Sequence, residues 1–189
     1  MSIIDHLAKN NLVTERLRLR PFQASDFAAL ATYATDPDVM HYMEEGVLDE
    51  QGVRAFLQKN AGDGATAYAL LLRDKDDLVG HMVFHPWFAP QTYEIGWVIA
   101  PPHQRQGYAT EAARELLRFS FEDLHAHRVI ATCQPENTAS YRVMEKIGMR
   151  REGHFRKCIH RGGDLWWDEY FYAILAEEWD QASLLGDHS

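Results

Sequence analysis

The stretch from Tyr93 to Leu124, YEIGWVIAPPHQRQGYATEAARELLRFSFEDL, decides the fold of this chain. Its opening residues, Tyr93–Ile99, place alternate side chains in two sets, as a pleated strand does. Pro101 and Pro102 end that strand, because neither can donate a hydrogen bond to a ladder. Beyond the next few residues, apolar side chains recur every three or four positions up to Leu124, which is typical of an amphipathic helix. The stretch therefore predicts a strand, a short loop and a long helix.

The loop between this strand and this helix has the features of an anion-binding site. A helix N-terminus carries unpaired backbone N–H groups and a partial positive charge. Gly107 lets the backbone approach a bulky group closely, and Arg105 adds a full charge beside it. Together these features predict a cradle for a pyrophosphate. The alternative, a glycine that serves only the turn, fits the same residues equally well.

The loop sequence, Q-x-x-G-x-A, resembles the acetyl-CoA loop of the GNAT acyltransferases. The phrases EIGWVI, QRQGYATEA and ENTASYRVMEKIGM are similar to the RimJ/RimL-type branch of N-acetyltransferases, and the resemblance extends from Thr14 to about Leu175. The two common nucleotide motifs, GxxxxGK[ST] and GxGxxG, are absent from the sequence. The resemblance implies acetyl-CoA as co-substrate, with these cofactor-binding residues: Trp97, Val98, Ile99, Gln104, Arg105, Gln106, Gly107, Tyr108, Ala109, Thr110 and Asn137.

The order of predicted elements indicates an α+β protein. The expected strands are Thr14–Arg20, Thr66–Leu72, Leu78–His85, Tyr93–Ile99, Arg128–Cys133, Met149–Lys157 and Leu165–Leu175. The expected helices run from an N-cap at Ser25 to Thr35, over Glu50–Asn60, through the stretch quoted above, over Thr138–Ile147 and over Ala176–Leu184. Such a mixed order predicts α+β. It resembles the GNAT fold, a mixed, mostly antiparallel central sheet of about seven strands flanked by helices, in which the fourth and fifth strands separate to admit the pantetheine arm.

Length and composition set the broad class of the protein. The 189 residues predict a single domain, with 1–13 as a lead segment and 176–189 as a C-terminal helix and tail. No apolar run approaches the roughly 18 residues that span a bilayer. The first residues, MSIIDHLAKNN, lack a basic start followed by a long apolar core, so we expect no secretory signal. Cys133 and Cys158 lie outside any C-x-x-C pair, so we expect two small buried side chains, no zinc site and no disulfide. These features predict a cytoplasmic protein without a metal.

The formal net charge of −9 argues against nucleic-acid binding, which calls for a basic face. It suits a cationic acceptor or a basic protein partner, although simple solubility explains the same charge. The sequence leaves the oligomeric state open, with a homodimer as one alternative.

The resemblance implies direct attack of a primary amine on the acetyl thioester. Glu94 corresponds to the glutamate that many family members use as a base through water; the alternative is a carboxylate that orders the sheet or binds the substrate cation. The main-chain amide of Trp97 or of Val98 is expected to polarise the carbonyl. Met144 stands where many GNATs carry a proton-donating tyrosine. Ser140 corresponds to a serine of the RimJ/RimL branch that donates to the thiolate, unless it only hydrogen-bonds its own helix.

The acceptor is predicted from the difficulty of deprotonating it. An α-amine has a pKa near 8, whereas a lysine near 10.4 must be deprotonated against roughly 4.6 kcal/mol at pH 7. A single water-relayed base therefore favours a protein N-terminal α-amine, as on a ribosomal protein. A small-molecule amine (an antibiotic or a polyamine) and an acyl-CoA sensor without turnover remain as alternatives. Tyr42, Trp87 and Phe88 are the predicted acceptor-binding residues.

Overall fold

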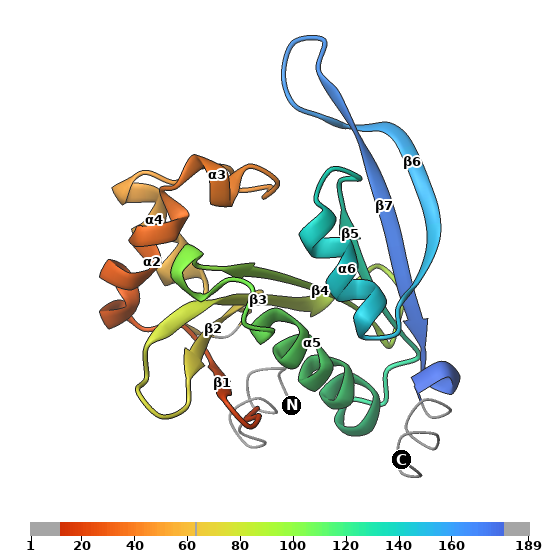
Figure 1. The fold of residues 1–189 in the computed structure, drawn as a ribbon, viewed down its shortest axis with the longest axis horizontal. Helices are drawn as coiled ribbons and strands as arrows, with labels where there is room; N and C mark the ends of the chain where they lie inside the picture. The colour runs from red at the N-terminus through yellow and green to blue at the C-terminus, as the bar shows by residue number, and fades with distance from the viewer. Residues whose placement is uncertain (1–11, 63, 180–189) are drawn as a thin grey trace. The chain divides into compact units, whose positions relative to one another are not determined.

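The computed structural model describes residues 12–62 and 64–179 (Figure 1). The strands of this part are β1 Leu17–Arg20, β2 Ala67–Leu72, β3 Leu78–Pro86, β4 Thr92–Ile99, β5 Arg128–Cys133, β6 Arg150–His160 and β7 Trp166–Leu175. The α-helices are α2 Phe27–Ala34, α3 Pro37–Met40, α4 Glu50–Lys59, α5 Tyr108–Arg118 and α6 Thr138–Lys146. Residues 176–179 are helical, while the remainder of the predicted terminal helix and most of the predicted lead segment fall outside the described residues.

The strands form one seven-stranded sheet in the order β1-β2-β3-β4-β5-β7-β6. The pairs β1–β2, β2–β3, β5–β7 and β6–β7 are antiparallel, and β4–β5 is parallel. The parallel ladder runs only from Thr92 opposite Arg128 to Glu94 opposite Ile130, although both strands continue. The predicted α+β class and the mixed, mostly antiparallel sheet are confirmed, and the short β4–β5 ladder agrees with strands that separate.

The chain divides into two compact units. The first unit comprises Met1–His85 and Gly96–Leu116, and the second comprises Pro86–Ile95 and Leu117–Ser189. Strand β4 therefore gives its first half to the second unit and its second half to the first. The assignment of 1–189 to one domain stays a prediction.

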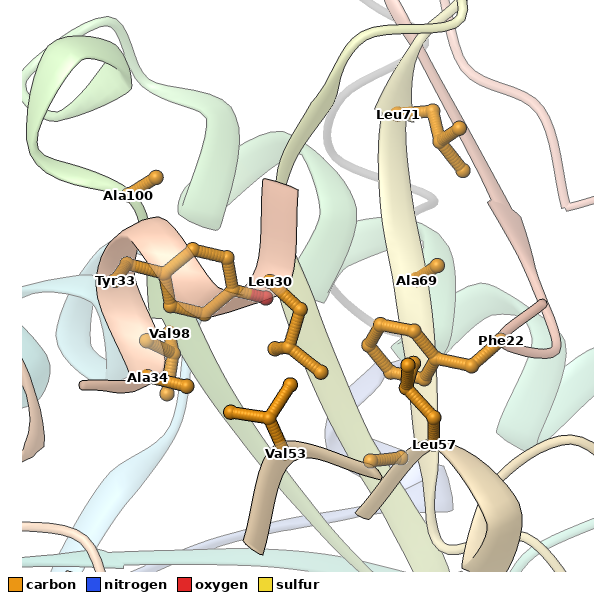
Figure 2. Packing of buried hydrophobic residues seen from close by; sticks show 11 residues of the cluster. Phe22, Leu30, Tyr33, Ala34, Val53, Leu57, Ala69, Leu71, Val98 and Ala100 are labelled. Atoms are coloured by element: carbon orange, nitrogen blue, oxygen red, sulfur yellow. The ribbon is translucent and has the colours of Figure 1, made fainter. Parts of the chain in front are cut away.

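The core of the first unit lies between β2 and the helices α2 and α4 (Figure 2). Ala67, Ala69 and Leu71 share one face of β2, as the two-residue period of a strand requires. The helices set fully buried residues such as Leu30 and Val53 against that face. Burying a side chain of this size contributes about 1.5–3 kcal/mol, so this packing fixes the sheet that leads into β4.

Two predictions at the start of the chain are wrong. Strand β1 begins at Leu17 and not at Thr14, because the backbone N–H of Thr14 donates to the Leu17 carbonyl (2.9 Å) and turns the chain. Ser25 is not the N-cap of the first helix. Asp26 takes that place, and its carboxylate accepts the backbone N–H of Gln23 at 2.8 Å.

Other differences concern burial and the ends of elements. Cys158 is exposed on β6, in contrast to the prediction, while Cys133 is buried as expected. The hairpin strand β6 extends to His160 because its ladder with β7 continues past a register shift. The predicted helix up to Leu124 consists of α5 followed by one π-helical turn, Phe119–Asp123. In this wider turn the backbone N–H of Leu124 donates to the carbonyl of Phe119.

Candidate functional site

The loop after β4 lies on the surface and bends through two left-handed residues. A 3-10 turn, Pro101–His103, follows the strand, and Arg105 (φ 62°) and Gly107 (φ 82°) come next. For a residue with a side chain, this left-handed backbone conformation costs roughly 1–2 kcal/mol of free energy. The conformation at Arg105 must therefore be held by neighbouring contacts, whereas glycine adopts it freely at Gly107.

Two glutamine side chains supply part of that support. Gln104 donates from Nε2 to the Ile99 carbonyl at 3.0 Å, and Gln106 donates from Nε2 to the Pro102 carbonyl at 3.2 Å. Both amides are thus used to shape the loop. Any contact that these two predicted cofactor-binding residues make with a ligand therefore falls to their backbone groups or their remaining polar atoms.

Helix α5 begins directly at the end of this loop. Its first backbone hydrogen bond runs from Glu111 N–H to the Gly107 carbonyl at 3.0 Å. The amides of Tyr108, Ala109 and Thr110 precede that bond and so have no acceptor one turn earlier in the helix. The exposed Arg105 and these amides make a positive helix terminus of the kind that binds phosphate groups. The predicted pyrophosphate cradle fits these residues.

The predicted residues on β4 differ in burial. Val98 is buried and belongs to the core of the first unit, while Trp97 and Ile99 are half-buried. Buried positions on this strand are Thr92, Ile95 and Val98 and do not simply alternate. The backbone amides of Trp97 and Val98 both stay candidates for polarising the thioester carbonyl.

Glu94 shares one face of the second unit with a group of aromatic side chains. It stands opposite Ile130 on β5, which stands opposite Ala173 on β7. Phe171 lies two positions before Ala173 on β7 and so shares its face. The ring centroid of Phe171 lies 5.5 Å from that of Trp87. The predicted base and the predicted acceptor residue Trp87 thus lie on the same face of this part of the sheet.

The aromatic group continues outward from Trp87 and Phe171. Phe88 lies against Trp87, with ring centroids 3.8 Å apart, and is 81% exposed. Phe155 on β6 lies 6.0 Å from Phe171 and is 50% exposed. We call Trp87, Phe88, Phe155 and Phe171 the aromatic face. The sequence did not predict Phe155 and Phe171 as part of this group. Only a correct register for the last hairpin would have placed them together.

Ser140 lies near the start of α6, on the other side of the second unit's sheet. Its backbone N–H is capped by the side chain of Asn137 (3.2 Å), and its hydroxyl hydrogen-bonds the thiol of Cys133. Cys133 lies three positions beyond Ile130 on a regular strand, so it points away from the Glu94 face. Burial raises the pKa of the Cys133 thiol to about 12, so the partner of Ser140 is a neutral thiol.

Tyr42 follows α3 in the first unit, and its ring centroid lies 4.7 Å from that of His41. Met144 is buried and offers no proton donor. Tyr141 packs its ring 6.0 Å from Tyr170 of β7.

Neither a metal-binding cluster nor a membrane-spanning helix occurs in residues 12–62 and 64–179. Within these ranges no three His, Cys, Asp or Glu side chains are grouped so as to hold a metal ion. The helices of the same part of the chain are too short or too polar to cross a membrane.

Comparison with known proteins places this arrangement in a family. Residues 16–150 match the model of the acetyltransferase (GNAT) domain. The chain is 53% identical over 170 residues to YnaD, an uncharacterised N-acetyltransferase of Bacillus subtilis (strain 168), over 90% of this chain and 99% of YnaD.

Two solved structures extend this likeness. The crystal structure of a GNAT-family acetyltransferase from Bacillus anthracis has a TM-score of 0.83 and 53% identity, and the match covers 87% of this chain and 98% of that one. A spermidine N-acetyltransferase from Vibrio cholerae, solved with CoA and spermine, shares the fold with a TM-score of 0.75 at 21% identity, over 88% and 99% of the two chains. The chain belongs to the GNAT family and is an acetyl-CoA-dependent N-acetyltransferase of the RimJ/RimL-like type.

Proposed function

We propose that this enzyme acetylates the α-amine of a protein N-terminus, of the kind found on ribosomal proteins. The observation that carries the proposal is that Glu94 lies on the same side of the sheet as the residues of the aromatic face. Two of those residues are open to solvent: Phe88 is 81% exposed and Phe155 is 50% exposed. Small-molecule sites usually enclose 70–90% or more of their ligand. An open surface beside a carboxylate suits the end of a polypeptide, whose first side chains need room.

In the proposed reaction the amine nitrogen attacks the thioester carbonyl carbon, and the C–S bond breaks. Glu94 takes the proton of the ammonium group through a water molecule. A main-chain amide of Trp97 or Val98 stabilises the oxyanion. The Ser140 hydroxyl donates a hydrogen bond to the departing thiolate. As the intermediate collapses, the nitrogen loses its second proton to solvent, and the thiolate takes up a proton from solvent. The loop Gln104–Thr110 binds the diphosphate of acetyl-CoA, and Asn137 holds the first turn of α6.

The basicity of the amine supports the same acceptor. An α-amine with a pKa near 8 is about one-tenth neutral at pH 7, whereas a lysine amine near 10.4 is neutral only in roughly one molecule in 2,500. One carboxylate acting through water is a modest base. It therefore serves an α-amine better than a lysine, unless the site itself lowers the lysine pKa.

A small-molecule amine is the second candidate. The net charge of −9 and a carboxylate on the same face of the sheet as aromatic rings also suit a polyamine, since a cation is attracted to the face of an aromatic ring. A sensor that binds acyl-CoA without turnover is the third. The first two candidates differ in the amine that they acetylate, and the third acetylates none, so one assay can separate all three.

The test is release of free thiol from acetyl-CoA with three acceptor sets: peptides with free N-termini and no lysine, the same peptides with blocked N-termini and one lysine, and small amines including spermidine. We expect turnover with the first set and a mass gain of about 42 Da, the mass of an added acetyl group, on the N-terminal residue. Turnover only with small amines would replace the proposal by the second candidate. CoA binding without turnover in any set would replace it by the sensor.

A further inference from the structure

Arg16, which precedes β1, contacts the acetyl-CoA loop although it lies 90 positions earlier in the chain. Its Nη1 donates to the carbonyl of Gln106 at 3.0 Å, and its Nε donates to Oε2 of Glu111 at 2.6 Å. Its guanidinium carbon lies 4.7 Å from the ring centroid of Tyr108. One side chain thus contacts the loop, the first residue of α5 and the residue one turn into that helix.

Glu111 places a negative charge one turn into a helix whose start is expected to hold a diphosphate. Partial burial would raise the pKa of its carboxyl group, but hydrogen bonds from Thr14 and Arg16 hold that pKa below its ordinary value. Thr14 Oγ1 donates to Oε1 of Glu111 at 2.5 Å, and the backbone N–H of Arg16 donates to the same oxygen at 3.0 Å. The carboxylate is therefore ionised and would repel an anion if it were left without its cation.

The loop also needs outside support for its shape. The left-handed backbone at Arg105 is held within the loop by the side-chain bonds of Gln104 and Gln106. The bond from Arg16 to the Gln106 carbonyl is one contact that joins this loop to the residues just before β1. A Cβ built at Gly107 would lie 3.5 Å from Nη2 of Arg16, so the guanidinium also lies beside this left-handed glycine.

We propose that Arg16 is a positioning residue for acetyl-CoA. It fixes the Gln106 carbonyl, and it neutralises Glu111, so that the loop amides present a net positive surface to the diphosphate. The inference rests on the proposed binding of the diphosphate by Gln104–Thr110. It predicts that Arg16 governs affinity for the diphosphate-bearing part of the co-substrate and leaves the chemical step nearly unchanged.

The test compares Arg16→Met with the wild-type enzyme by calorimetric titration with CoA and by acetyl-transfer kinetics. We expect the Kd for CoA and the KM for acetyl-CoA to rise roughly 10- to 100-fold, with kcat within about twofold, because an anion site loses a cation and a fixed carbonyl. Arg54→Met is the matched control. Arg54 pairs with Glu50 on the exposed surface of α4. The Arg54→Met substitution therefore removes the same charge at another place in the first unit.

Two further measurements separate positioning from a general effect on the fold. S-acetylpantetheine lacks the diphosphate, so its kcat/KM should be the same in the wild type and in Arg16→Met. Adding Glu111→Gln to Arg16→Met should recover at least threefold in CoA affinity, because the unpaired carboxylate is then gone. Should Arg16→Met fail to fold, Arg16→Lys is measured instead and should bind CoA at least threefold more weakly, since lysine loses the forked geometry.

The outcomes are distinct. Wild-type protein that gives no heat with CoA removes the proposed function itself. Wild-type binding together with equal binding by the Arg16 variant overturns the role of Arg16 and leaves the proposed function standing. An equal loss with acetyl-CoA and with S-acetylpantetheine also overturns it, because the effect would then not concern the diphosphate.

Discussion

Acid should destabilise the first unit through one buried histidine. His81 on β3 is 3% exposed. Its Nδ1 lies 3.0 Å from the hydroxyl of Tyr33, and the rings of Phe22 and Phe56 lie 6.1 and 5.3 Å from its own. Burial lowers the pKa of His81 from 6.5 to about 4. The folded protein therefore holds this imidazole neutral at pH values where the unfolded chain binds a proton.

The sign and size of the effect follow from that difference in pKa. The contribution of His81 to stability is fully present above pH 6.5, falls as the pH drops from 6.5 to about 4, and is then lost. A difference of roughly two pKa units corresponds to about 3 kcal/mol in all. Most of this, about 2 to 3 kcal/mol, should be lost between pH 7.5 and pH 4.5.

Urea unfolding followed by tryptophan fluorescence at pH 7.5 and pH 4.5 measures this loss, with His81→Gln as the comparison. Glutamine stays neutral at both pH values and can still bond the Tyr33 hydroxyl. Asp26 and Glu111, whose carboxyl pKa values are lowered, titrate in both proteins and cancel in the difference. We expect the pH-dependent loss to be smaller in the variant by about 2 to 3 kcal/mol. Equal losses in the two proteins would refute the reasoning.

The remaining predictions concern the chemistry and one tight backbone contact. Glu94→Gln should lower kcat more than tenfold with the Kd for acetyl-CoA nearly unchanged, and wild-type turnover would remove Glu94 from the role of base. Ser140→Ala should lower kcat across the pH range, most where thiolate departure limits the rate; an unaltered pH profile would end that assignment. Gly80→Ala places a Cβ 2.1 Å from the Val98 carbonyl oxygen and should reduce the free energy of unfolding by about 3 kcal/mol or more. Gly62→Ala meets no atom within 4 Å and should change it by less than about 0.5 kcal/mol.

The sequence predicted best those elements whose signals lie within a single segment of the chain. The helix after Asn137 was placed correctly because the asparagine caps it and Gly148, with φ 88°, ends it. The β2–β3 hairpin and β5 followed from alternation and burial within each segment. The order of strand, loop and helix around Gly107 was predicted correctly because its signals are adjacent in the chain, while the role of the loop in binding acetyl-CoA stays a prediction.

Contacts between distant segments lay beyond that reasoning. Arg16 and Glu111 are 95 positions apart, and the alternating pattern around Arg16 indicated only an exposed strand residue. The turn at Thr14 depends on a bond to Leu17 that competes with strand pairing. The hydrogen bond between Ser140 and Cys133 joins α6 to β5, so neither residue's own segment reveals it.

Hydrogen–deuterium exchange with and without CoA tests the central claim most directly. If the backbone of Gln104–Thr110 binds the diphosphate, peptides covering this loop and the first turn of α5 should exchange more slowly when CoA is present, because their amides become hydrogen-bonded to phosphate oxygens. Unchanged exchange there under saturating CoA, or protection confined to other segments, would contradict the account.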